Sequence, residues 1–133
     1  MAPPLGSSDD RAAIRAAVKD GTLGIFATDH APHPFASKQG GFIGTANGII
    51  GLEVAVAITY HVMVEQEGMD VNEWAKRWTE GPARLIGEEP DGETILDLHA
   101  NRTVDVETFK SLSRNMPYMG LKFSAWPLPT CRI

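Results

Sequence analysis

The sequence comprises 133 residues, 43% hydrophobic and 22% charged, with a formal net charge of -5. This length and composition are typical of one ordinary globular domain. Because no basic cluster offsets the negative charge, we expect no nucleic-acid partner. A single cysteine, Cys131, excludes an intrachain disulfide and is compatible with a cytoplasmic location. No apolar run is long enough to span a bilayer, so no membrane partner is expected.

The first predicted element is a short amphipathic helix between Ser7 and Gly21. Ser7 supplies a hydroxyl cap, acidic residues follow in the first turn, and glycine is common just after a helix. Next, Leu23–Thr28 is apolar at successive positions, which predicts a strand buried on both faces. Residues 34–48 are rich in glycine and lack periodicity, so we expect a long flexible loop of the kind that often carries function.

The longest helix is expected over residues 48–67. Asp70 and Glu73 have the spacing of a capping box and predict the start of another helix. Pro82 suits the first turn of a further short helix, which Gly87 ends. All the elements predicted over residues 48–87 are helices. Leu23–Thr28 is therefore the one buried strand predicted before Gly92.

The pattern changes after Gly92. Residues 94–98 and 102–106 read as two strands separated by a turn at Asn101, followed by a short helical patch near Phe109 and an irregular proline-rich tail. One buried strand between two helices cannot form a sheet alone. The chain is therefore expected to be a piece of a larger α/β architecture.

The strongest candidate for a functional site is the stretch ATDHAPH, residues 27–33. A buried strand that ends in polar side chains is typical of α/β folds whose sites lie at strand ends. Asp29, with His30 and His33 close by, could bind a metal ion or hold a proton for transfer. From these residues alone, an ordinary polar turn at the strand end stays open as the alternative.

Further motifs accompany ATDHAPH along most of the chain: Pro3–Leu5, Lys38, GIIGLE at 48–53, GPARLIG at 81–87, Val104-Asp105, and Phe109–Tyr118. In this order they resemble motifs of the dihydroorotases, the cyclic amidohydrolases of pyrimidine synthesis. The pairing of ATDHAPH with GIIGLE separates dihydroorotases from hydantoinases and allantoinases, whose corresponding motifs differ. The sequence is therefore similar to a dihydroorotase of class I type over its C-terminal portion.

This resemblance implies an α/β fold, namely the C-terminal part of a (β/α)8 metal-dependent hydrolase barrel with a remnant of a small β-sandwich. Residues 1–87 would form the last helix-strand-helix units of the barrel, and residues 88–133 the β-rich segment of the sandwich. Such a piece is incomplete as a stand-alone barrel. The implied activity is the reversible, zinc-dependent cyclisation of N-carbamoyl-L-aspartate to dihydroorotate.

The resemblance also implies roles for individual residues. Asp29 would touch the metal and carry the proton between the bridging water and the substrate nitrogen. His33 would hydrogen-bond the substrate carboxylate, and the backbone of Asn47 and Gly48 would contact the ring. His30 is expected to be structural.

The sequence departs from the family pattern in its metal ligands. The HxH pair that opens the family's metal site is absent, and the remaining ligands would lie before Met1. Catalytic zinc generally needs about three protein ligands, so this chain alone is not expected to hold zinc tightly. Ala2 and Gly6 also stand where the family usually has asparagine and arginine in its substrate-binding segment.

We therefore expect this chain to supply part of a site, completed by the missing N-terminal portion or by a homo-oligomer. The alternative is a catalytically inactive relative, kept as a binding or assembly partner, possibly for aspartate carbamoyltransferase, or a truncated fragment. In either case the expected small molecules are carbamoyl-aspartate and dihydroorotate.

Overall fold

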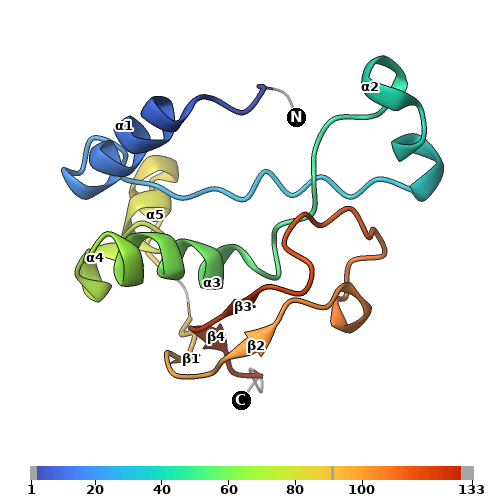
Figure 1. Ribbon diagram of the computed structural model, residues 1–133. Coiled ribbons are helices and arrows are strands. Elements are labelled where there is room, and N and C mark those ends of the chain that lie inside the picture. Colours follow the sequence, from blue (N-terminus) through green and yellow to red (C-terminus); the bar gives the residue numbers. More distant parts are fainter. Residues whose placement is uncertain (1–2, 91, 130–133) are drawn as a thin grey trace.

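The structure is a computed structural model and describes residues 3–90 and 92–129. The helices are α1 (Ser8–Lys19), α2 (Gly41–Gly44), α3 (Ala55–Tyr60), α4 (Val71–Lys76) and α5 (Glu80–Ile86). In Figure 1, α1, α3, α4 and α5 lie toward the left, α2 lies apart from them at the upper right, and the short strands lie below α3. Within the described ranges no helix is long and apolar enough to cross a membrane. Ala2 and Cys131, both discussed above, lie outside the described residues.

The predicted helix after Ser7 is confirmed as α1. The Ser7 hydroxyl accepts a hydrogen bond from the Asp10 N–H at 3.2 Å, and the Asp10 carboxylate accepts from the Ser7 N–H at 2.7 Å. These two bonds satisfy N–H groups that a helix start leaves unpaired. The same contacts with Ser7 lower the pKa of Asp10. Gly21, with φ of +87°, ends the turn that follows the helix.

The predicted strand Leu23–Thr28 is wrong as a paired strand, although the segment is extended. In Figure 1 it crosses the molecule as part of a long light-blue trace and belongs to neither sheet. Leu23 and Ile25 are 42% and 37% exposed, so burial on both faces is also wrong. A strand is held by neighbours at about 4.8 Å on its two edges, and the described part of the chain places no strand there.

The helix predicted over residues 48–67 is confirmed only in its second half. α3 begins at Ala55, and the chain continues it as a π-helix over His61–Gln66. Gly48 cannot be part of the helix because its φ of +104° lies outside the helical region, and the residue just before the helix, Val54, has a φ of -120°. The expected loop before it contains two short helical turns, a 3-10 turn at Phe35–Lys38 and α2.

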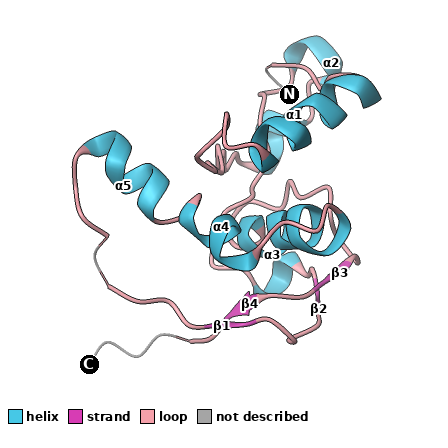
Figure 2. Ribbon diagram, turned by 90° about the vertical axis from the view of Figure 1, so that its left-hand side faces the viewer, coloured by secondary structure: helices cyan, strands magenta, loops and turns pink. Residues whose placement is uncertain are grey.

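The β-rich end forms two small antiparallel pairs with an unexpected pairing (Figure 2). The strands are β1 (Leu96–Asp97), β2 (Arg102–Thr103), β3 (Lys122–Phe123) and β4 (Trp126–Pro127). β1 pairs with β4, and β2 pairs with β3. The two predicted strands are therefore neighbours in the sequence but do not pair with each other. Their partners come from the tail that was expected to be irregular. The helical patch is a 3-10 turn at Val106–Thr108, just before Phe109.

Two clusters of apolar side chains hold these elements together. The first joins the start of α3 to the β-rich end: Ile50, Val54, Ala57, Val104, Val106, Met116, Phe123 and Trp126. The second joins α1, the π-helix and α4: Val18, Met63, Met69 and Trp74. α3 contributes side chains to both clusters, and it therefore links the helices to the strands.

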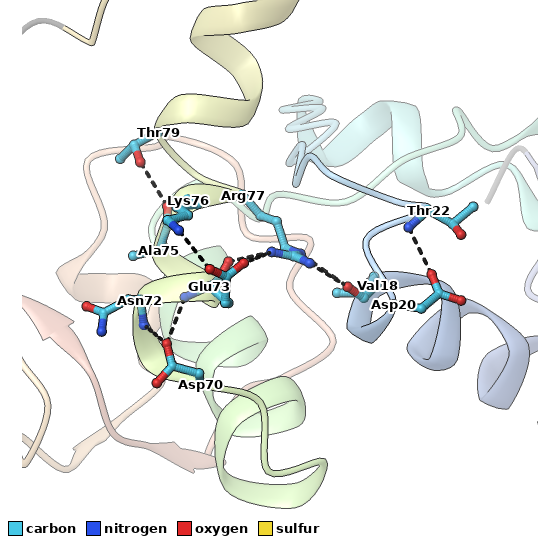
Figure 3. A network of polar contacts seen from close by, with 10 residues as sticks. All are labelled: Val18, Asp20, Thr22, Asp70, Asn72, Glu73, Ala75, Lys76, Arg77 and Thr79. Atoms are coloured by element: carbon cyan, nitrogen blue, oxygen red, sulfur yellow. Dashed lines mark hydrogen bonds and ion pairs between the residues drawn. The ribbon is translucent and has the colours of Figure 1, made fainter.

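Arg77, at the end of α4, connects α4 to α1 from a buried position (Figure 3). Its Nε and Nη2 donate to the Val18 carbonyl at 3.2 and 2.8 Å, and its Nη1 donates to the Glu73 carbonyl at 2.6 Å. Its own carbonyl accepts from the Phe26 N–H at 2.9 Å. One residue thus holds the end of α1 and the extended segment that leads to the candidate site.

We expect Arg77→Met to lower the free energy of unfolding by about 2–3 kcal/mol, because the Val18 carbonyl loses a charged donor inside the structure. Methionine keeps an apolar stem of similar length. Urea unfolding followed by circular dichroism measures the change, with Lys76→Met as the control. Lys76 is exposed, and among the described residues its ammonium has a hydrogen-bond partner only in the exposed Glu73, so its variant should unfold like the parent. Equal losses in both variants would contradict the assigned role of Arg77.

Candidate active site

The structure brings the two main motifs, ATDHAPH and GIIGLE, into direct contact. The Ala31 N–H donates to the Ile49 carbonyl at 3.0 Å. The His30 Nδ1 accepts from the N–H groups of Gly51 and Leu52 at 3.2 and 3.1 Å. Because Nδ1 is the acceptor, the ring proton of the neutral imidazole is on Nε2. His30 therefore has the structural task that the sequence suggested, and it holds the two motifs together.

Gly48 allows this close approach. A Cβ at this position would lie 2.5 Å from the Cβ of Ala31 and 3.9 Å from the His33 Nε2. Its φ of +104° is also a conformation that side chains with a Cβ rarely adopt. The glycine thus lets the backbone of the second motif lie close to His33. Gly48 and His33, both predicted to bind substrate, lie 15 positions apart in the sequence.

Asp29 is exposed at the end of the extended segment and has a free carboxylate. Within residues 3–90 and 92–129, neither of its oxygens has a hydrogen-bond or ion-pair partner. Its φ of +45° lies in the left-handed region, which aspartate tolerates better than most residues but still occupies rarely. Such conformations concentrate at functional sites. The structure therefore leaves Asp29 available to a ligand, a metal ion or a water molecule.

A third region of the chain, the segment around Asn115, reaches the same turn. The Asn115 Nδ2 donates to the Gly48 carbonyl at 2.6 Å, and the Ile50 N–H donates to the Asn115 carbonyl at 3.1 Å. From the other side, Lys38 Nζ donates to the carbonyls of Ala46 and Gly48 at 2.5 and 2.8 Å. The sequence signalled Lys38 and Asn115 only through motif resemblance and gave neither of them a place in the site.

The turn borders an open cavity of about 540 Å³. Its lining comes from the loop, the turn and the β-rich end: Lys38, Phe42, Thr45, Asn47, Gly48 and Asn115 among others. Asn47 and Gly48 therefore line a cavity that is open to small molecules, and their assignment to substrate binding stays a prediction.

The metal-binding residues of such a site are not complete here. In the part of the chain that the structure describes, no three His, Cys, Asp or Glu side chains lie close enough together to bind one ion. Structural and catalytic zinc sites use at least about three protein ligands. Asp29 is thus a single candidate ligand, and these residues do not fit a zinc site on their own.

The comparison with solved structures identifies the class of fold. L-hydantoinase (dihydropyrimidinase) from Arthrobacter aurescens matches 96% of this chain with a TM-score of 0.85 and 24% identity, over 31% of its own length. D-hydantoinase (dihydropyrimidinase) from Thermus sp. matches the same shares with a TM-score of 0.82 and 21% identity. The chain therefore shares the fold of about a third of these hydantoinase structures.

The comparison with curated sequences gives a narrower family than the comparison of folds. Dihydroorotase from Geobacillus sp. (strain WCH70) is 37% identical over 139 residues, and that from Brevibacillus brevis is 37% identical over 138 residues; both alignments cover 98% of this chain. No family model matches the sequence. The chain spans about a third of the length of the curated relatives it matches. Over that third it is homologous to the dihydroorotases, which confirms the resemblance seen in its motifs.

We expect Gly48→Ala to destabilise the protein by about 3 kcal/mol, since the new Cβ combines a disfavoured φ with a clash against Ala31. Gly44→Ala in the same loop is the matched control, because a Cβ there meets no atom within 4 Å. Thermal unfolding of both variants measures the difference. A Gly48→Ala protein that unfolds at the same temperature as Gly44→Ala would disprove the close packing of the two motifs.

Proposed function

We propose that this chain forms one wall of a dihydroorotase-type active site and supplies its acid–base residue. One observation carries this proposal: the ATDHAPH and GIIGLE motifs are bonded to each other, through His30 and Ala31, while the carboxylate of Asp29 is left free. A turn that served only the fold would have no need to keep an unpaired carboxylate next to a histidine and an open backbone turn.

The proposed reaction is the reversible opening of a cyclic ureide, dihydroorotate, to N-carbamoyl-L-aspartate. In the opening direction water adds to the ring carbonyl carbon, and the bond from that carbon to the ring nitrogen breaks. Asp29 accepts the proton of the attacking water and gives it to the departing nitrogen, so the carboxylate is regenerated. Ring closure uses the same groups in reverse, with Asp29 taking the proton from the ureido nitrogen.

His33 and the 47–48 backbone would bind the substrate in this scheme. His33 is half-buried beside Gly48, so its imidazole can donate to the substrate carboxylate while the turn contacts the ring. The zinc ion of the proposed enzyme would need ligands from outside the described residues. We propose that these come from the portion of the relatives that this chain does not match, or from a second copy, in a cytoplasmic protein.

Titration of the 15N-labelled chain with dihydroorotate and with carbamoyl-aspartate tests the proposal. We expect the amide signals of residues 47 and 48 to shift and His33→Ala to weaken binding about tenfold, the loss of one charge-assisted hydrogen bond. His99→Ala is the control, because His99 is exposed and its imidazole makes no hydrogen bond within the described ranges. Signal changes confined to another surface would refute this ligand site.

A second proposal is an assembly partner without catalysis, and one observation favours it. An open groove of about 580 Å³ runs between α1 and α3. Apolar side chains dominate its lining: Leu5, Ile14, Val18, Phe26, Ile58 and Met63 among others. Leu5 and Ile14 are 84% and 57% exposed. Apolar grooves of this kind often mark protein contact sites.

Size-exclusion chromatography with aspartate carbamoyltransferase separates the two proposals. If this chain is an assembly partner of that enzyme, the mixture elutes earlier than either protein, and Ile14→Asp, which places a charge in the groove, abolishes the shift. Lys19→Asp, a charge change on the same helix that does not touch the groove, should leave it. Separate elution of the two proteins would count against this role.

A further inference from the structure

The turn at residues 47–49 presents three successive backbone N–H groups without acceptors. Within the described ranges, the N–H groups of Asn47, Gly48 and Ile49 donate to no protein atom. On either side of them the N–H groups are used: that of Ala46 by the Ser37 carbonyl and that of Ile50 by the Asn115 carbonyl. Asn47 is exposed, and Gly48 and Ile49 are half-buried. These N–H groups are therefore accessible to a hydrogen-bond acceptor from outside the protein.

The orientation of these N–H groups follows from the contacts of Lys38. Lys38 Nζ holds the carbonyls of Ala46 and Gly48. In a planar trans peptide the carbonyl and the next N–H point in opposite directions. The N–H groups of Asn47 and Ile49 therefore both point away from the Lys38 ammonium, and a single side chain holds both peptide planes.

Asn115 holds the Gly48 peptide from a different part of the chain. Its amide donates to the Gly48 carbonyl, which thus accepts hydrogen bonds from both Asn115 and Lys38. The bond crosses 67 positions in the sequence and links the turn to the β-rich end. With two donors from two segments, this carbonyl cannot rotate, and the Ile49 N–H in the same peptide plane is fixed with it.

Lys38 carries a charge that the fold leaves uncompensated. It is half-buried, and within the described residues no carboxylate lies within ion-pair distance of its ammonium. A half-buried charge is costly to keep without a partner. The positive charge raises the electrostatic potential around the turn, which favours an anionic ligand over a neutral one at the nearby N–H groups.

We propose that Lys38 and Asn115 are positioning residues that fix the 46–49 backbone as a rigid donor array for an oxygen-rich anionic ligand, a carboxylate or ureide oxygen. This inference rests on the proposed function for the identity of the ligand, but not for the clamp itself. Neither side chain needs to touch the ligand. Each acts through the peptide plane that it holds.

The first experiment examines the clamp without ligand. Asn115→Asp removes the amide donor without changing the size of the side chain, and Lys38→Met removes the ammonium. We expect lower 15N heteronuclear NOE values for residues 47–49 in both variants. Asn101→Asp and Lys110→Met are the matched controls, because both residues are exposed and neither side chain has a hydrogen bond in the described ranges. Their NOE values should equal those of the parent.

The second experiment measures binding of dihydroorotate to the same proteins. We expect Lys38→Met and Asn115→Asp to weaken binding about tenfold or more, and Lys38→Arg to recover part of the loss because it keeps the charge and two donors. If Asn115→Asp fails to fold, Asn115→Gln takes its place, because glutamine keeps the amide group but displaces it by one methylene. Partial recovery by arginine distinguishes positioning from a general loss of packing.

The results separate the two proposals. Increased mobility of 47–49 in the variants, with no binding of dihydroorotate to the parent, keeps the clamp and overturns the proposed ligand. Binding that is equal in the parent and in both variants, with unchanged NOE values, overturns the clamp and keeps the proposed function. Increased mobility together with weaker binding supports both.

Discussion

Arg77 joins α4, α1 and the extended segment that leads to the candidate site. Its buried guanidinium donates to the Val18 carbonyl at the end of α1 (Figure 3). Its backbone carbonyl accepts from the Phe26 N–H. Phe26 lies three positions before Asp29 in a segment that no sheet supports. In a complete sheet, ladder hydrogen bonds would fix such a segment. Here one buried arginine and one backbone bond define where it leaves the helices.

From that point, contacts among three distant stretches build the site. His30 secures the ATDHAPH motif to the start of GIIGLE, Gly48 lets the two backbones approach, and Asn115 joins both to the β-rich end. The apolar cluster around Ile50 and Val104 lies under the same junction. The site is thus part of the packing between the helical half and the strands.

The sequence predicted the capped helix α1 and the Asp70 start of α4, because helix caps depend on neighbouring residues. The Asp70 side chain accepts from the N–H groups of Asn72 and Glu73, as a cap should. The sequence could not predict that β2 pairs with β3, because short strands choose partners by packing across the core rather than by local pattern. The bond from Asn115 to Gly48 could not be predicted either, since it spans 67 positions.

What the sequence alone determined is therefore the chemistry: an aspartate and a histidine in one motif, a glycine turn in another, and the homology that both carry. The tertiary structure decided which of these groups meet and which remain free. A carboxylate is a base wherever it stands, but only the fold leaves that of Asp29 without a partner. Likewise, only the fold brings Lys38 and Asn115, which lie far apart in the sequence, to the same Gly48 carbonyl.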